Sequence, residues 1–600
     1  MQRMYFESNM KKRLSFGSYF SLLAQKRIAW LLLGLIVVAY VIILGDQSVL
    51  RYNVFKATAF DLGNMDQATW NTLHGHFVEF TNHSDNWYGA PIRLAQHVEP
   101  IFLLLAGLYA FGSDPRILLI FQTLMLAAGA IPVFLLARKS LPTLPLLAPV
   151  MVLGYLLAPA VLGENLFDFH PLTLVTPLLL YAVLALTYRK HVWFVILCIL
   201  VAACKEEMGS VVALLALVAI WKYRIPRLGS IVFVGGIVWT LLAFLVIKPH
   251  FNVGAQQDNY WYRYEALGPT PVAAIFNILG HPWIIFGVLV TLDRLYYLAS
   301  LLRSTGFIAL LAPEWLIPTL PSLAINLLTS ESFQHNGVYH YHAAIIPFVI
   351  IAAIHGTRRL YLYWYGLRDE KEEQQLYRED TALGRTIYAD GKPLPGSVAL
   401  LNWLRSSALS IWHWLIRGWR FLVARLHLSS LTAGWQSRKK LLRLRMKDLA
   451  AWMPATWLQG VLSIWLVCMI VLNIVVIWPL LNSFLADHRP GPREQHIQQL
   501  LDMIPPDAVV SAGGNINPHL TERRYVTVFP ELTVATMTPG QYKMVDYVIV
   551  DLDNASPENK SYSDNFLDVL NQIQRKGEFR PIAQADGVIL LVREKNIAQR

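Results

Sequence analysis

The sequence predicts an α-helical protein that crosses a membrane many times and carries a small α/β domain near its C-terminus. Two observations support this fold class. Apolar residues make up 55% of the 600 residues and charged residues only 15%, a composition well outside the range of soluble proteins. Eleven apolar segments are also long enough, or nearly long enough, to cross a bilayer, which takes roughly 20 helical residues. We therefore expect about eleven spans.

The expected spans differ in how well they fit a membrane. In chain order they are 28–45, 116–138, 144–162, 171–188, 191–204, 207–222, 228–248, 273–292, 306–328, 340–357 and 459–481. The first follows several Lys and Arg residues, which favours a retained signal-anchor with a cytoplasmic N-terminus. The segments 191–204 and 207–222 are short and must be tilted, shielded by neighbours or incompletely inserted.

Segment 98–112 decides the topology, because it is apolar but short for a span at 15 residues. If it does not cross, the basic clusters fall into cytoplasmic loops, as the positive-inside rule favours. These clusters are Arg138-Lys139, Arg189-Lys190, Lys222 with Arg224 and Arg227, Asp293-Arg294, and Arg358-Arg359. The rule therefore predicts that 98–112 is an interfacial or re-entrant helix on the outer face. The first outer loop then extends over 46–115, within a membrane domain 1–357.

Two polar regions flank the last expected transmembrane region, 459–484. Residues 358–458 hold seventeen Lys or Arg against eight Asp or Glu, and the stretch 398–426 mixes Trp with Arg. Such a basic amphipathic helix on the cytoplasmic side suits an anionic membrane surface, although a solvated linker is the alternative. Membrane orientation therefore explains the net charge of +11, and nucleic acid is not an expected partner.

Residues 485–600 form the expected extracytoplasmic α/β domain. Helical patterns occur at 492–504 and 563–575, and short apolar runs predict strands at 508–512, 525–529, 546–551 and 587–593. Gly513-Gly514, after the first of these strands, lacks the Lys-Ser/Thr that completes a phosphate loop. A nucleotide-binding role is therefore not indicated for this domain.

With this topology, the conspicuous polar residues at the loop edges fall on the outer face. Charge at the end of a span is costly unless it is paired or faces water, so we expect these residues to converge on a hydrated cavity. The candidates are Asp61, Asp66, Gln67, Arg93, His97 and Glu99 in the first loop, Asp168 and His170 in the next outer loop, Lys205 and Glu206 in a short turn, and His340 and His342 after residue 328.

Each candidate also has a purely structural explanation. Asp61 precedes a helix-like stretch and could be only its N-cap. Lys205 could pair with Glu206 or Glu207, and each histidine could be a hydrogen-bonded interface residue. A metal site built from Asp and His stays open, because no spacing singles one out. The three cysteines lie inside apolar segments and offer neither a disulfide framework nor metal-type spacing.

Several stretches make the chain resemble a known family. They are Phe60-Asp61-Leu62-Gly63 through Asp66-Gln67 and Trp70-Asn71, then His97–Pro100, Asn165–Pro171, Lys205-Glu206-Glu207 and Ile504-Pro505-Pro506-Asp507. On these stretches the chain resembles a bacterial family of polytopic membrane proteins defined as domain of unknown function 2079, which is allied to the GT-C membrane glycosyltransferases. The resemblance covers roughly 28–357 and 459–600.

The resemblance implies a GT-C-like fold in the bacterial inner (plasma) membrane. Its first outer loop would supply a catalytic acid, by position Asp61, with Asp66 as the nearest second acid. Such enzymes transfer a sugar from a polyprenyl-phosphate donor to an acceptor on the outer side, here an unknown glycan, lipid or protein. GT-C enzymes often carry an acidic pair, whereas this chain has Asp61-Leu62. The use of a divalent cation is therefore left open.

The residues themselves suit such a transfer. A carboxylate base would deprotonate the acceptor hydroxyl, and Asp61 is the candidate. Positive charge would stabilise the departing phosphate, and Lys205 and Arg93 are the candidates. Two other classes of function stay open, namely a polytopic transporter or lipid flippase and a non-catalytic membrane scaffold. The internal repeats that many transporters show are not visible in the sequence.

Overall fold

The computed structural model describes residues 16–82, 90–252, 260–281, 283–368, 455–553 and 560–594. The chain divides into two compact units, one formed by residues 1–354 and 464–600 and the other by residues 355–463. The expected amphipathic helix at 398–426 lies outside the described residues and stays a prediction. All contacts considered below lie within the first unit.

Four stretches of helix in the described residues are long and apolar enough to cross a membrane. They are Leu23–Asn53 in α2 (Phe16–Asn53), Pro115–Ser140 in α6 (Pro115–Ala128) and α7 (Ala130–Ser140), Pro226–Phe251 in α13 (Pro226–Leu242), η3 (Ala243–Ile247) and α14 (Lys248–Phe251), and Trp457–Phe484 in α23 (Ala455–Phe484). Two bent helix pairs raise the number to six if each pair is one span. The expected count of eleven is therefore not confirmed.

Most of the other expected spans are shorter or broken helices, whereas the segment 340–357 leads into a helix of 23 residues. One bent pair is α8 (Leu147–Leu156) with α9 (Pro159–Leu166), which meet at 49°, and the other pairs η4 (Trp261–Leu267) and α15 (Pro271–Gly280) with α16 (Trp283–Leu289) at 103°. The remaining helices are η2 (Pro171–Leu174), α10 (Val175–Thr187), α11 (His191–Ala202), α12 (Met208–Lys222), α17 (Leu292–Arg303) and α19 (Ile346–Arg368). Helices as short as α11 were expected to be tilted or shielded by their neighbours.

The expected span 306–328 is not a continuous helix. Short 3₁₀ turns, η5 (Ile308–Leu311), η6 (Pro313–Trp315) and η7 (Ile317–Thr319), precede the nine-residue helix α18 (Leu320–Leu328). Proline lacks the N–H that an interior helical residue donates, and its ring clashes with the preceding turn. Pro313, Pro318 and Pro321 therefore break this segment into short pieces.

Segment 98–112 contains only the eight-residue helix α5 (Phe102–Tyr109). At 1.5 Å per residue it is roughly 12 Å long, which is far too short to cross a bilayer. Instead, α5 packs against α3 (Asn64–Leu73) of the same loop. The prediction that this segment is not a spanning helix is confirmed.

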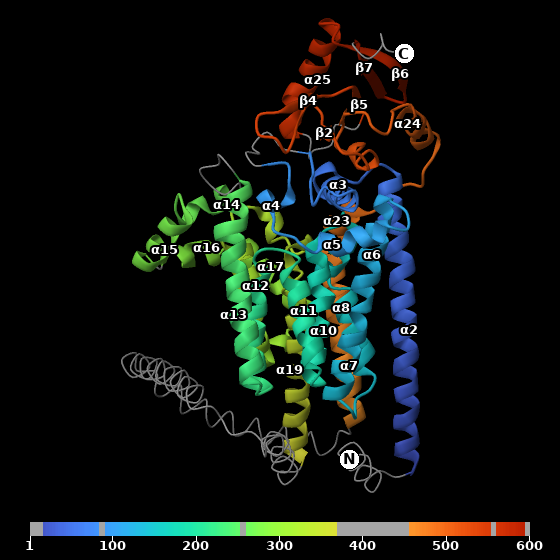
Figure 1. Ribbon diagram of the computed structural model, residues 1–600. Helices are drawn as coiled ribbons and strands as arrows, with labels where there is room; N and C mark the ends of the chain where they lie inside the picture. The colour runs from blue at the N-terminus through green and yellow to red at the C-terminus, as the bar shows by residue number, and fades with distance from the viewer. Residues whose placement is uncertain are drawn as a thin grey trace. The chain divides into compact units, whose positions relative to one another are not determined.

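The two ends of the helical bundle carry different features. At one end, hydrogen bonds join the C-terminal ends of α7, α10 and α12. Lys139 Nζ donates to the Thr187 carbonyl at 2.7 Å, and an Arg189 amino group donates to the Tyr223 carbonyl at 2.9 Å. At the other end lie α3, α4 (Arg93–Gln96) and α5 of the first loop (Figure 1). Lys139 and Arg189 thus lie at the end opposite the first loop, as the basic clusters predict. The cluster Asp293-Arg294 does not follow this prediction: Arg294 donates to the carbonyls of Leu327 and Thr329, and Asp293 pairs with His335, in the loop that was expected on the outer side.

The C-terminal region forms a five-stranded sheet with the strand order β2-β1-β5-β7-β6. Its strands are β1 (Val510–Ala512), β2 (Val526–Val528), β5 (Tyr547–Asp551), β6 (Phe579–Ala585) and β7 (Val588–Arg593). Strand β1 runs parallel to β2 and β5, whereas β7 runs antiparallel to its two neighbours. The predicted strands and the helices α24 (Pro492–Asp502) and α25 (Lys560–Arg575) are confirmed.

Alternating side chains of the central strands enter two separate apolar cores, as the two-residue period of a strand requires. Ile549 packs with Ile497 of α24 in one core, and Val550 packs with Ile573 of α25 in the other. Strand β6 was not predicted, because Pro581 and several exposed polar residues hide its pattern, as is common in edge strands. The small pair β3 (Thr533–Ala535) and β4 (Tyr542–Met544) was also missed.

This domain is joined to the end of α2 by packing as well as by charge. The His519 ring, in η10 (Asn517–His519), stacks between the rings of Tyr52 and Phe55, each with a centroid separation of 4.0 Å. Phe55 belongs to the apolar core that α24 covers. Lys56 and Asp487 add an ion pair at 3.1 Å. The loop that follows α2 is therefore part of the surface on which the domain rests.

Candidate functional site

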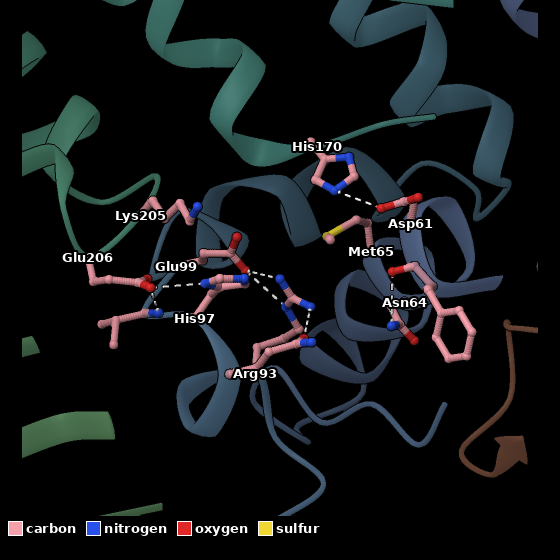
Figure 2. Close-up of polar contacts among 12 residues, drawn as sticks. Asp61, Asn64, Met65, Arg93, His97, Glu99, His170, Lys205 and Glu206 are labelled. Atoms are coloured by element: carbon pink, nitrogen blue, oxygen red, sulfur yellow. Dashed lines mark hydrogen bonds and ion pairs between the residues drawn. The ribbon is translucent and has the colours of Figure 1, made fainter. Parts of the chain in front are cut away.

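Asp61 lies in η1 (Ala59–Gly63), a five-residue π-helix that leads directly into α3. Its carboxylate is 27% exposed and pairs with His170 Nε2 at 3.0 Å, as Figure 2 shows. The Thr58 hydroxyl lies 3.1 Å from the second carboxylate oxygen. Asp61 stands inside the π-helix, while Thr58 and Gly63 occupy the N-cap positions of η1 and α3. The simple N-cap explanation of Asp61 therefore does not describe its contacts.

Gln122 of α6 holds the loop that presents His170. Its side-chain oxygen accepts hydrogen bonds from the His170 backbone N–H at 3.2 Å and from the Thr173 hydroxyl at 2.9 Å. Its amide group donates to the Glu164 carbonyl at 2.7 Å. The His170 ring also stacks on His340 at 3.7 Å, which fixes its plane. Sequence analysis missed Gln122, although a buried amide inside an apolar span was a usable signal.

Asp168 is buried beside Asp61 and shares Thr58 with it. The Thr58 backbone N–H and hydroxyl each lie 2.7 Å from one Asp168 oxygen, and Arg51 Nε lies 3.5 Å from the other. A hydroxyl has one proton to donate, so Thr58 can serve only one of the two carboxylates at a time. Sequence analysis missed both Thr58 and Arg51, because each becomes meaningful only next to Asp168.

The environments of the two carboxylates push their pKa values apart. Burial of Asp61 acts to raise its pKa, but the neighbouring His170, Thr58 and Arg51 outweigh burial and leave the pKa below the ordinary value. Burial of Asp168 raises its pKa, and the nearby Arg51 compensates only in part. Asp61 is therefore the carboxylate that stays ionised, whereas Asp168 resists ionisation. Opposite shifts of this kind are typical of an acid and a base in one site.

Arg93 and Glu99, both predicted site residues, form a buried ion pair. Glu99 Oε2 lies 2.9 Å from Arg93 Nε and 2.6 Å from a terminal nitrogen, and the two side chains are 2% and 3% exposed. The other terminal nitrogen donates to Gln96 at 2.5 Å. Arg93 is thus occupied by partners from its own loop.

Glu206 ties the first loop to the turn before α12. Its carboxylate accepts hydrogen bonds from His97 Nδ1 at 2.9 Å and from the Val98 backbone N–H at 3.0 Å, with Lys248 3.7 Å away. Burial acts to raise the pKa of Glu206, but His97, Lys248 and Lys205 outweigh burial and hold the pKa well below its usual value. Figure 2 shows this network around His97.

Lys205 lies in the same turn and forms an ion pair with Glu207 at 3.1 Å, its side chain 15% exposed. Burial acts to lower the pKa of Lys205, but Glu207 and Glu206 outweigh burial and raise the pKa above its usual value. Lys205 is therefore a permanent cation. Its pairing with Glu207 is the structural alternative that sequence analysis left open.

His340, in η9 (His340–His342), connects the Asp61 group with the Lys205 group. Burial lowers the pKa of His340, and the positive charges that His170, Lys205 and His97 can carry lower it further, well below its usual value. The ring is therefore neutral at physiological pH. His342 is fully buried elsewhere, where its Nδ1 lies 3.0 Å from the Tyr297 hydroxyl. The structure thus brings His340, but not His342, to the site.

Asp66 and Gln67 face the C-terminal domain and are sealed from solvent. Asp66 accepts hydrogen bonds from the Tyr109 hydroxyl and, at 2.6 Å, from the Thr521 hydroxyl. Gln67 donates to backbone carbonyls of Arg523 and Arg524 at 3.2 and 3.1 Å. Both residues were expected at the Asp61 site, and the contacts instead place their side chains in the seam between loop and domain.

A metal site of conventional composition is not formed by the described residues, among which no group of three or more His, Cys, Asp or Glu side chains has suitable geometry. The divalent cation that the sequence left open stays a prediction. Among the described residues, Asp61 has Asp168 as a carboxylate neighbour, and the two offer at most part of a ligand set.

Glu522, next to the Asp66 seam, is expected to make stability depend on pH. Burial, followed by the nearby charge of Asp114, raises the pKa of Glu522 to about 7. A raised carboxyl pKa stabilises the fold only while the group is protonated, so this contribution is lost as pH rises from about 4.5 to about 7. Glu522→Gln should therefore raise the melting temperature at about pH 8 and change it little at about pH 4.5. Equal shifts at both pH values would contradict this assignment.

The fold and the site define a multi-helical protein whose long helices suit membrane spans and whose first loop gathers ionisable residues. The chain belongs to the family described as "Predicted membrane protein (DUF2079)", whose model matches residues 51–372 and 411–590. No curated protein matches the sequence.

Three solved structures match the chain along most of its length at low identity. ArnT from Cupriavidus metallidurans in the apo state is 13% identical, with a TM-score of 0.42 over 95% of this chain and 98% of ArnT. ArnT bound to undecaprenyl phosphate is 12% identical, with a TM-score of 0.39 over 93% and 97%. The apo oligosaccharyltransferase from Archaeoglobus fulgidus is 11% identical, with a TM-score of 0.38 over 87% and 70%. At TM-scores below 0.5 we draw no conclusion from these likenesses.

Proposed function

We propose that the protein is a membrane glycosyltransferase that moves a sugar from a polyprenyl-phosphate donor to an acceptor on the outer face, with Asp61 as the general base. One observation carries the proposal. His170 pairs with the Asp61 carboxylate and favours its ionised form, and the Asp61 side chain is partly exposed to solvent. Asp168, whose pKa is raised, lies beside it. The motif resemblance around Asp61 supplies the reaction class.

In this reaction the acceptor hydroxyl loses its proton to Asp61 while its oxygen bonds to the anomeric carbon of the sugar. The bond between that carbon and the phosphate oxygen breaks, and the phosphate leaves with the electron pair. His170 keeps the carboxylate in one orientation through the 3.0 Å contact. The Thr58 hydroxyl can donate to the opposite oxygen when it does not donate to Asp168.

The departing phosphate gains negative charge, so a nearby cation lowers the barrier. Lys205 is our candidate, because it is a permanent cation and shares His340 as an electrostatic neighbour with His170. Arg93 also remains a proposed phosphate ligand, but its buried partner Glu99 already satisfies its charge. To bind a phosphate, the Lys205 ammonium would have to leave its ion pair with Glu207 or contact the phosphate and Glu207 together.

Lys205→Gln is therefore expected to weaken binding of polyprenyl phosphate and to slow transfer, since charge on the phosphate grows in the transition state. Lys205→Arg should restore the charge but only part of the activity, because a planar guanidinium places its donors differently. Binding and melting temperature are measured on the purified variants. Lys56→Gln removes a lysine whose partner is Asp487 and serves as the control. A lower melting temperature with unchanged donor binding would leave Lys205 as a structural partner of Glu207.

The reaction class is tested with purified protein in proteoliposomes that contain polyprenyl-phosphate sugars. Mass spectrometry of lipids and glycans from cells with and without the protein supplies the candidate donors and acceptors. A covalent sugar product that depends on the protein supports the proposal. Movement of the lipid across the bilayer without a covalent product would instead indicate a flippase or transporter.

We also propose that the first loop and the C-terminal domain face the extracytoplasmic side of the bacterial inner membrane, with the N-terminus in the cytoplasm. The basic residues in the turns at the opposite end of the bundle support this orientation. Single cysteines labelled with an impermeant thiol reagent test it, and labelling of the 358–458 insert from outside would overturn it.

A further inference from the structure

We propose that the C-terminal domain sets the position of Asp61 through Asn517, which is a positioning residue more than 400 positions away in the sequence. The contact runs through Asn82 of the first loop and through Gly63. The catalytic consequence rests on the proposed function of Asp61, whereas the effect on the backbone around Asp61 does not.

Asn517 and Asn82 form a reciprocal pair of buried amides. Asn82 Nδ2 donates to Asn517 Oδ1 at 2.8 Å, and Asn517 Nδ2 donates to Asn82 Oδ1 at 2.9 Å. The second proton of Asn517 Nδ2 goes to the Thr527 carbonyl at 3.2 Å, which anchors the pair to β2. The two residues are 1% exposed or less, so loss of either partner would leave buried polar groups without hydrogen bonds.

The amide pair touches both ends of the π-helix that carries Asp61. Asn82 Nδ2 gives its second proton to the carbonyl of Ala59, the first residue of η1, at 3.4 Å. At the last residue, Gly63, a Cβ atom would lie 2.8 Å from Asn517 Oδ1, closer than real Cβ contacts allow. Any side chain at position 63 would therefore push the pair away. Asp61 stands between these two contacts.

We call the Asn82–Asn517 pair, with its contacts to Ala59 and Gly63, the clamp. It matters because a π-turn is a rare conformation that depends on its surroundings. In η1 the Gly63 N–H bonds to the Thr58 carbonyl at 3.1 Å, across five residues, in place of the four of an α-helix. Relaxation to an α-helical turn would change the directions of the side chains within and after the turn, by up to about 100° for a shift of one residue. Such a shift would carry the Asp61 carboxylate away from His170, with which it pairs at 3.0 Å.

Other hydrogen bonds also join the C-terminal domain to the first loop, so the domain should stay in place when the clamp is removed. The Thr521 hydroxyl binds Asp66 at 2.6 Å, and the Thr81 hydroxyl binds the Val526 carbonyl at 2.6 Å. Thr521→Val is a matched control, because it keeps the methyl group near Gly63 while removing a buried hydrogen bond of the same seam.

The test compares hydrogen–deuterium exchange of the full-length protein across peptides that cover residues 59–64. Asn517→Ala and Asn82→Ala should each raise exchange there by about tenfold, the effect of losing one buried hydrogen bond. Thr521→Val should lower the melting temperature to a similar degree without that local change. Gly63→Ala should reproduce the local change with every hydrogen-bonding group still present, which covers the case in which an asparagine variant does not fold.

Unchanged exchange of 59–64 in Asn517→Ala and Gly63→Ala, or an equal rise in Thr521→Val, would overturn the proposal. Where transfer is measurable, the clamp variants should lower kcat more than they change KM, because donor-binding groups stay in place. If exchange of 59–64 rises in the clamp variants but the wild type shows no transfer, the proposed function is wrong and the positioning role of Asn517 is still supported. The two ideas therefore fail separately.

Discussion

Asp61→Asn is expected to abolish sugar transfer while leaving the melting temperature nearly unchanged. The amide keeps the shape of the side chain and one oxygen that can accept a hydrogen bond, but it cannot take a proton from the acceptor. Loss of a general base typically costs about 10²–10⁴-fold in rate. Because the pKa of Asp61 lies below the ordinary 3.8, the wild type should lose transfer only as pH falls below that value. Rates and melting temperatures of the purified proteins decide the outcome.

Asp66→Asn is the matched control for this substitution. It changes the other conspicuous aspartate of the motif, which binds Tyr109 and Thr521 inside the seam. We expect a lower melting temperature and a smaller loss of transfer than for Asp61→Asn. Full activity of Asp61→Asn would reduce Asp61 to a structural residue, and equal loss in both variants would mean that transfer depends on the seam around Asp66 as much as on the Asp61 carboxylate.

Arg93→Met is expected to produce the largest loss of stability among the site variants. It leaves Glu99 buried at 3% exposure without its cation. Removing one member of a buried ion pair typically costs about 3–5 kcal/mol, because the remaining charge is neither solvated nor paired. Denaturant or thermal unfolding in detergent measures the loss.

The double variant Arg93→Met/Glu99→Leu separates the two roles of Arg93. Replacing both charges by apolar groups removes the uncompensated charge, so most of the lost stability should return. If Arg93 also holds the donor phosphate, the double variant should still bind polyprenyl phosphate weakly. Normal donor binding in the stabilised double variant would assign Arg93 to the structure alone.

Local sequence patterns determined the parts of the fold that depend on neighbouring residues. The long apolar runs predicted α2, α13 and α23, because the cost of burying polar groups in a bilayer is read directly from composition. Alternating and helical periodicity predicted most of the C-terminal domain. The prolines at 313, 318 and 321 also predicted a broken helix, but they did not predict the series of 3₁₀ turns that replaces it.

The sequence by itself also determined which loops hold the polar residues, since Asp61 lies in the loop after the first apolar segment, and His170 and Lys205 stand at the ends of apolar segments. Their pairing was decided only by the tertiary structure. Buried polar groups must find partners, but composition does not say which ones. Asp61 meets His170, whereas Asp66, five residues further on, meets Thr521, 455 residues away. The π-turn between them points the two carboxylates to different sides, and long-range packing around that turn, which no local pattern encodes, holds each side chain where it lies.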